Sequence, residues 1–131
     1  MINKRKLKFV IFKEERGYGA SCNLGDIFIA TGGDDFEELR SNILEATNLA
    51  FEDEKIEYSM DELVFTYDLE SFFDFYKVIN AKALSQRIGM NQSLLAQYIR
   101  GIKKPSPAQT RRILEGVQQI GKELTEVRFL L

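Results

Sequence analysis

The side chains whose types and spacing could carry chemistry lie in residues 84–106, LSQRIGMNQSLLAQYIRGIKKPS. This stretch predicts two short helices, because Gly89 can take the positive φ that ends the first and Asn91 can cap the second. Leu94, Leu95 and Tyr98 then repeat at helical spacing and would bury one side of the second helix. The opposite side would carry short, amide or basic side chains, of the kind that can reach base edges in a DNA major groove. These are Gln92, Ser93, Ala96, Gln97 and Arg100.

The net charge of −2 hides an uneven distribution of charged residues. Residues 1–69 contain 8 basic and 15 acidic residues, whereas residues 70–131 contain 10 basic and 5 acidic ones. No acidic residue lies between Lys77 and Arg112. Such an acid-free basic stretch favours a phosphate-contacting surface over a merely solvated one, and the asymmetry suggests two domains with different partners. We expect phosphate contacts from Lys82, Asn91, Arg100, Lys103 and Lys104.

The composition excludes several classes of function. The chain has no histidine and one cysteine, Cys22, which allows neither an intramolecular disulfide nor the usual zinc chemistry. We therefore expect no metal and no cofactor. The basic start is interrupted by Lys8 and ends at Lys13, so its apolar run is too short for a signal peptide or a membrane span. We expect a cytoplasmic protein without a membrane partner.

Four carboxylates, Asp34, Asp35, Glu37 and Glu38, form the densest acidic group that could be imagined to bind metal. They lie in or before the first turn of a predicted helix, where the helix dipole favours negative charge. Two-metal catalysis instead needs carboxylates that converge from several strands. Cys22 has no histidine to activate it, so it fits a small core residue. We therefore expect no catalytic residues and no enzyme, and an RNA-processing enzyme is the least favoured class.

The acidic half predicts a small sheet with one helix. Apolar residues alternate in residues 7–12, with both faces of the strand largely covered, and two further strands complete a meander. Asp35 and Glu38 would then cap a helix with an apolar stripe that begins at Phe36 and Leu39. A fourth strand follows, which gives the order βββαβ and returns the chain parallel to the first strand.

The basic half predicts an all-α domain of about five helices, over residues 70–131. The aromatic-rich residues 71–79 would form its first helix, and Asn80 would cap the second, residues 81–88. Ser106 would cap the last helix, with Pro107 at the first helical position. Gly116 and Gly121 weaken that last helix by up to about 1 kcal/mol each relative to alanine. Close packing against another helix would explain both glycines.

The segment GYGAS, followed after a loop by TGGDDFEELRSNILEATNLAFED, resembles the N-terminal domain of HicB-type antitoxins over about residues 7–69. The resemblance implies a partial RNase H-like α+β domain in residues 1–69. Domains of this family bind and block a small HicA-like toxin that cleaves mRNA. The sequence does not identify the toxin-contacting residues.

The second half resembles the Xre/Cro class of helix-turn-helix domains over roughly residues 71–124. The resemblance rests on the leucine and isoleucine before Gly89, on Tyr98 and Gly101, and on the basic loop that closes on proline and serine. It implies a DNA-binding domain in residues 70–131 and operator double-stranded DNA as a partner. Three side chains fall at positions that contact bases in this class: Gln92, Ser93 and Gln97. A glutamine there could hydrogen-bond N6 and N7 of adenine.

Together the two resemblances imply an antitoxin of a type II toxin–antitoxin system that neutralises its toxin and represses its own operon. A homodimer or higher even oligomer is expected, because one helix contacts only a few base pairs of a palindrome. The alternative is a stand-alone helix-turn-helix transcriptional repressor whose first domain serves dimerisation or binds another protein. The apolar tail, residues 125–131, could serve the dimer or pack onto its own domain, and the sequence leaves both open.

Overall fold

The computed structural model describes residues 4–131, so the first three residues of the basic start lie outside the described residues. The chain divides into two compact units with the boundary between Phe75 and Tyr76. The sequence placed a domain boundary between residues 69 and 70, six residues before the division between these two units. Glu70 and Asp74 belong to the first unit, which therefore carries 8 basic and 17 acidic residues, net −9. The second unit carries 10 basic and 3 acidic residues, net +7.

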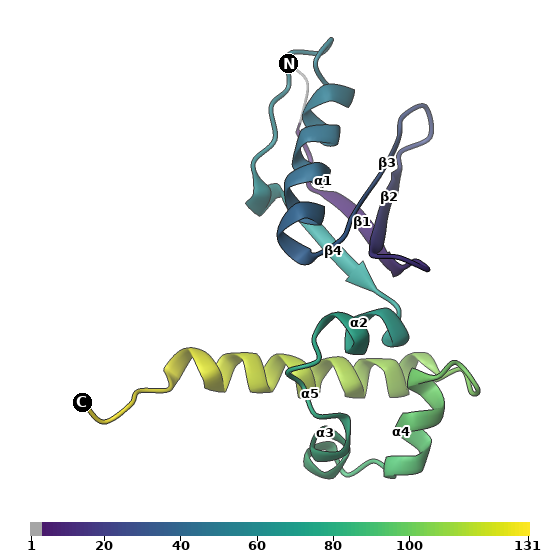
Figure 1. Cartoon of the computed structure of the whole chain (residues 1–131), viewed down its shortest axis with the longest axis vertical. Coiled ribbons are helices and arrows are strands. Elements are labelled where there is room, and N and C mark those ends of the chain that lie inside the picture. Colours follow the sequence, from purple (N-terminus) through teal and green to yellow (C-terminus); the bar gives the residue numbers. More distant parts are fainter. Residues whose placement is uncertain (1–3) are drawn as a thin grey trace. The chain divides into compact units, whose positions relative to one another are not determined.

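The first unit is a four-stranded mixed sheet with helices, and the predicted order βββαβ is confirmed (Figure 1). Its elements are β1 (Leu7–Lys13), β2 (Tyr18–Asn23), β3 (Phe28–Gly33), α1 (Phe36–Ala50), the 3-10 turn η1 (Met60–Glu62), β4 (Leu63–Tyr67) and α2 (Leu69–Phe75). The strand order is β3-β2-β1-β4. The β1–β2 and β2–β3 pairs are antiparallel, and β4 returns parallel to β1 as expected.

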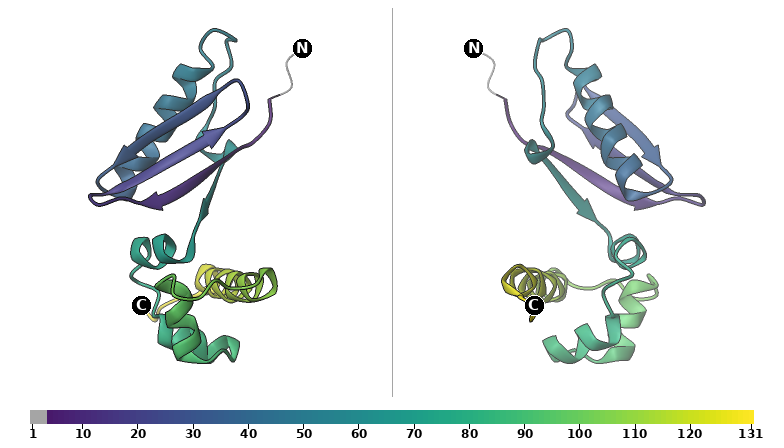
Figure 2. Two further views of the ribbon diagram at one scale, coloured as in Figure 1. Left: turned by 90° about the vertical axis from the view of Figure 1, so that its right-hand side faces the viewer. Right: turned by 60° about the vertical axis from the view of Figure 1, so that its left-hand side comes forward.

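Helix α1 covers one face of this sheet and leaves the other face open (Figure 2). Phe9 of β1 and Ile43 of α1 are fully buried in the core between them. On the opposite face Val10 and Val64 are exposed, and Phe28 is 66% exposed. The expectation that both faces of β1 are largely covered is therefore wrong. Apolar side chains on both sides of a strand do not reveal which side the single helix covers.

The start of α1 agrees with the predicted cap. The side chain of Asp35 accepts a hydrogen bond from the backbone N–H of Glu38 at 2.9 Å. Gly33 precedes this cap, and a Cβ there would lie 2.6 Å from the backbone nitrogen of Leu39. The helix thus begins in close contact with the end of β3, and the acidic residues at its start serve the helix terminus.

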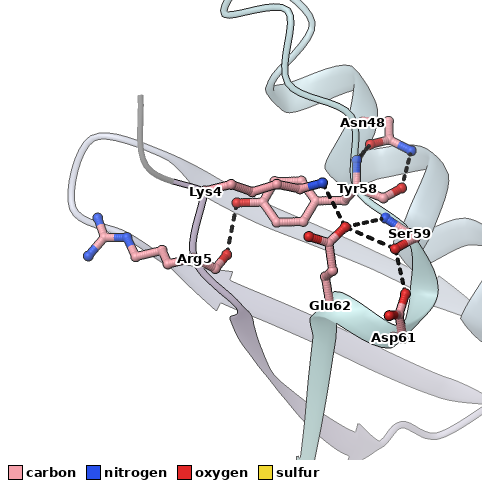
Figure 3. A network of polar contacts seen from close by, with 7 residues as sticks. All are labelled: Lys4, Arg5, Asn48, Tyr58, Ser59, Asp61 and Glu62. Carbon is pink, nitrogen blue, oxygen red and sulfur yellow. Dashed lines mark hydrogen bonds and ion pairs between the residues drawn. The ribbon is translucent and has the colours of Figure 1, made fainter. Parts of the chain in front are cut away.

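A polar network fixes the connection between α1 and β4 (Figure 3). Asn48 of α1 accepts a 2.6 Å hydrogen bond from the backbone N–H of Tyr58 and donates one to the carbonyl of Tyr58 at 3.2 Å. The hydroxyl of Tyr58 donates to the carbonyl of Arg5 at 3.0 Å. Lys4 lies 5.0 Å from the centre of the Tyr58 ring and forms a 2.7 Å ion pair with Glu62. These contacts attach the start of β1 to the chain that leads into β4.

Helix α2 packs onto the first unit, although the aromatic-rich residues 71–79 were expected to form the first helix of the second domain. Asp68 caps it by accepting the N–H of Ser71 at 2.7 Å, and the Ser71 hydroxyl accepts the N–H of Lys13 at 2.9 Å. The ring of Phe75 lies 4.6 Å from that of Tyr18 and 4.8 Å from that of Phe36. The aromatic residues of α2 therefore extend the core of the sheet.

The second unit, Tyr76–Leu131, contains three helices, fewer than the predicted five: α3 (Ala81–Ile88), α4 (Gln92–Ile99) and α5 (Pro107–Glu126). Each begins at the predicted side-chain cap, Asn80, Asn91 or Ser106. Leu84, Leu95 and Ile113 are buried where the three helices meet.

Candidate nucleic-acid interface

A tight turn joins α3 to α4 and fixes the angle between them. Gly89 ends α3 in the left-handed region at φ 68°, as predicted. The next N–H, of Met90, donates to the carbonyl of Ser85 at 2.9 Å, and the Met90 side chain is buried. Arg112 of α5 donates from one guanidinium nitrogen to the carbonyls of Ile88 and Gly89 at 2.7 and 2.8 Å. A cation at the negative end of α3 satisfies carbonyls that the helix leaves without partners.

The outward side of α4 carries the side chains expected to contact bases. Leu95 is buried, whereas Gln92 and Ser93 are exposed and Gln97 is half-buried. The helical spacing places Ser93 and Gln97 on the side of the helix away from Leu95, whereas Gln92, three residues before Leu95, lies at the flank between the two sides. The first turn of α4 is also its most exposed part. The side chains of Gln92 and Ser93, at the start of α4, are therefore accessible to a partner.

Three predicted site residues meet at one shallow pocket of about 150 Å³ between α3 and α4. Lys82 contributes from the first turn of α3, Gln92 from the first turn of α4, and Arg100 from the end of α4. The other lining residues are small or apolar: Ala81, Ala96 and Ile99. Two cations beside a helix N-terminus form a site for an anionic oxygen, because the helix dipole and the free N–H groups add to the positive charge.

The remaining predicted residues lie around this pocket. Ser93 and Gln97 lie on the outward side of α4, and the Asn91 side-chain oxygen accepts the N–H of Leu94 at 3.2 Å as a cap. After α4 the chain turns at Gly101, whose φ is 74°, and the N–H of Ile102 returns to the carbonyl of Gln97 at 2.9 Å. Lys103 and Lys104 follow in this loop and are exposed. The loop therefore holds two further cations close to the outward side of α4.

Two arginines of the acid-free interval have structural roles that the sequence did not suggest. Arg87 forms a 2.6 Å ion pair with Glu123, and this bond holds the pKa of the Glu123 carboxyl below its usual value. Arg112 binds the end of α3. The ion pairs found among residues 4–131 include none of Lys82, Arg100, Lys103 or Lys104. These four cations are thus available to a partner.

Other kinds of site find less support in the part of the chain that the structure describes. No group of histidine, cysteine and acidic residues there could hold a metal ion. Cys22 is buried as expected, and burial raises the pKa of its thiol. None of the described helices is both long and apolar enough to cross a membrane.

Comparisons with models of known protein families, with curated proteins and with solved structures find no match to this chain.

Proposed function

We propose that the second unit is a helix-turn-helix DNA-binding domain of the Xre/Cro class and that the whole chain is a HicB-type antitoxin. In this proposal the chain represses its own operon through the second unit and neutralises a small HicA-like, mRNA-cleaving toxin through the first. The observation that carries the DNA-binding part is the convergence of Lys82, Arg100 and Gln92 at the N-terminus of α3.

The pocket at α3 suits a DNA phosphate. A phosphate oxygen placed there gains the charge of Lys82 and Arg100 together with the N-terminus of α3. Lys103 and Lys104 add cations in the loop after α4, so that phosphate contacts from the pocket and from this loop would hold the helix in a major groove. The net charge of +7 on this unit supplies the sequence-independent part of the binding energy.

The first turn of α4 suits base recognition. Recognition helices of this class direct their N-terminal residues at base edges. Gln92 and Ser93 are exposed at that turn, and Gln97 lies one turn after Ser93 on the same side of the helix. A glutamine can form two hydrogen bonds with adenine, which discriminates against a wrong base by about 1 to 3 kcal/mol.

The first unit supports the toxin-binding part through its charge. A small protein that cleaves RNA must attract phosphates and is therefore expected to be basic. The net charge of −9 on the first unit complements such a protein. Its sheet and helix follow the βββαβ order that the resemblance implies for the toxin-binding domain of HicB-type antitoxins.

Selection of bound duplexes from a random DNA pool tests the DNA-binding part without knowledge of the operator. We expect the wild-type chain to enrich one sequence. The Gln92/Gln97 double alanine variant should bind the enriched DNA more weakly while its affinity for random DNA is unchanged. If both proteins bind the enriched DNA with equal affinity, the proposal that Gln92 and Gln97 contact bases is wrong.

The proposal expects a small open reading frame for the toxin beside the gene, and co-expression with its product tests the toxin-binding part. We expect a stable complex and relief of growth arrest. The Gln92/Gln97 double alanine variant is the matched control, because it should still neutralise the toxin while it loses repression. If no neighbouring product is toxic or binds, the chain is instead a stand-alone transcriptional repressor whose first unit serves dimerisation or another protein.

A further inference from the structure

Helix α5 carries an inner apolar stripe that packs against its own unit. Ile113 is buried, and a Cβ added at Gly116 would collide with Cγ2 of Ile88 on α3. The same Cβ would lie 3.3 Å from Cδ1 of Leu84. Gly116 thus lets α3 and α5 approach closely, which explains the first of the two glycines in this helix.

A second stripe on α5, the outer stripe, is only partly covered by the described residues of the chain. It consists of Leu114, Val117, Gly121 and Leu124, whose separations are three, four and three residues. Leu114 is 50% exposed and Leu124 is 65% exposed. A repeat that averages 3.5 residues is the spacing at which one helix packs along another. The outer stripe therefore has the pattern of a helix–helix contact that the single chain leaves unmade.

Gly121 supports the same conclusion. A Cβ at this position would meet no atom within 4 Å, so nothing in the single chain requires a glycine here. In a helix interior glycine costs about 1 kcal/mol relative to alanine. A second helix that crosses at Gly121 explains the residue, because the absent side chain lets the two backbones approach.

We propose that the outer stripe binds the outer stripe of a second copy of this chain. The residues that flank the stripe around Gly121 are uncharged: Gln118 and Thr125 on one side and Ile120 on the other. Two identical helices can therefore meet here without like-charge repulsion, whereas a strongly charged partner would find no complementary charge.

The exposed apolar side chains continue from the outer stripe into the tail. Beyond the outer stripe, the tail does not pack onto its own unit, and Phe129 is 85% exposed. The C-terminal half of α5 extends past α3 and α4 (Figure 1). Leu114, Leu124 and the apolar residues of the tail together form a run of exposed apolar side chains, which in a soluble protein marks an interface with another protein.

The biological role of this dimer rests on the proposed DNA-binding function. Two copies joined through α5 would present two α4 helices, as a palindromic operator requires. The evidence for the interface itself comes from α5 alone, so self-association can be measured without DNA.

Sedimentation velocity of the full chain tests the interface. We expect a dimer for the wild type at micromolar concentration. Leu124→Glu should weaken self-association at least about tenfold, because it places a carboxylate in an apolar contact. Val78→Glu is the matched control, since Val78 is 90% exposed in the same unit but lies outside α5, and it should leave the dimer intact. Leu124 is exposed in the single chain, so its replacement should not unfold the protein.

Gly121→Ala supplies an independent test. It should weaken the dimer, because the added methyl group separates the crossing backbones, while the helix content of the chain is kept. A monomeric wild type, or Leu124→Glu and Val78→Glu variants that associate equally, overturns the interface.

Binding to a duplex with one half-site, measured in parallel, separates the two proposals. A wild type that binds this DNA as a monomer overturns the interface and leaves the proposed function in place. A dimer that binds no DNA supports the interface and overturns the DNA-binding function.

Discussion

The hydroxyl of Tyr18 donates a 2.6 Å hydrogen bond to the carboxylate of Asp74, 56 residues further along the chain. The ammonium group of Lys13 lies 3.1 Å from the other oxygen of the same carboxylate. Asp74 is thus bonded to both strands of the first hairpin. This relationship ties α2 to the sheet and ends the first unit at Phe75.

Tyr18→Phe should lower the free energy of unfolding of the first unit by about 1 kcal/mol, because it removes this hydrogen bond and keeps the ring that packs on Phe75. The pKa of Tyr18 is raised to about 12, first by desolvation and then by Asp74. The raised pKa stabilises the fold below pH 10 and this contribution is lost as the pH rises towards 12. Urea denaturation at neutral and alkaline pH measures both effects. An unchanged midpoint at neutral pH would contradict the assignment.

Glu62 should set part of the acid stability of the first unit. Its ion pair with Lys4, followed by hydrogen bonds from Ser59, lowers its pKa to about 2 (Figure 3). A lowered pKa stabilises the fold above the ordinary value of 4.5, and the contribution is lost as the pH falls from there towards 2. Glu62→Gln should therefore flatten the decrease of thermal midpoint in this range. Glu45→Gln, on the exposed side of α1, is the control, and identical acid profiles for both variants would refute the prediction.

Local signals in the sequence predicted the starts and ends of helices well. The caps at Asp35, Asn80 and Asn91 and the left-handed Gly89 are short-range features, since each depends on residues at most four positions away. The strand order followed from the change of hydrophobic period and from the parallel return of β4.

Long-range contacts account for what the sequence did not reveal. The aromatic residues of α2 are apolar on several sides, so periodicity alone could not assign them to the sheet or to the second unit. Phe75 packs on Tyr18, and Asp74 of the same helix bonds to Tyr18 and Lys13, all more than fifty residues earlier in the chain. The role of Arg112 likewise depends on the carbonyl of Ile88, 24 residues before it. Charge patterning counted Arg112 among the cations of the acid-free interval, but it cannot show which of these cations the fold itself uses.

The two glycines of α5 should respond in opposite directions to alanine. Gly116→Ala should cost about 1 to 3 kcal/mol of stability, because its methyl group collides with Ile88. Gly121→Ala should raise the stability of the monomer by up to about 1 kcal/mol, since the added carbon meets nothing within the chain. Thermal unfolding at concentrations below the dissociation constant of the dimer compares them. Changes of the same sign would contradict the packing described for α5.

The salt dependence of DNA binding tests the central claim most directly. The pocket at the start of α3 should hold a phosphate, so Lys82→Ala and Arg100→Ala should each weaken binding to all sequences and lower the slope of log K against log salt by about one. Lys103→Ala should act similarly from the loop, whereas Lys122→Ala on α5 should leave the slope unchanged. A slope that stays at the wild-type value in the Lys82/Arg100 double variant, or the absence of salt-dependent binding in the wild type, would contradict the account.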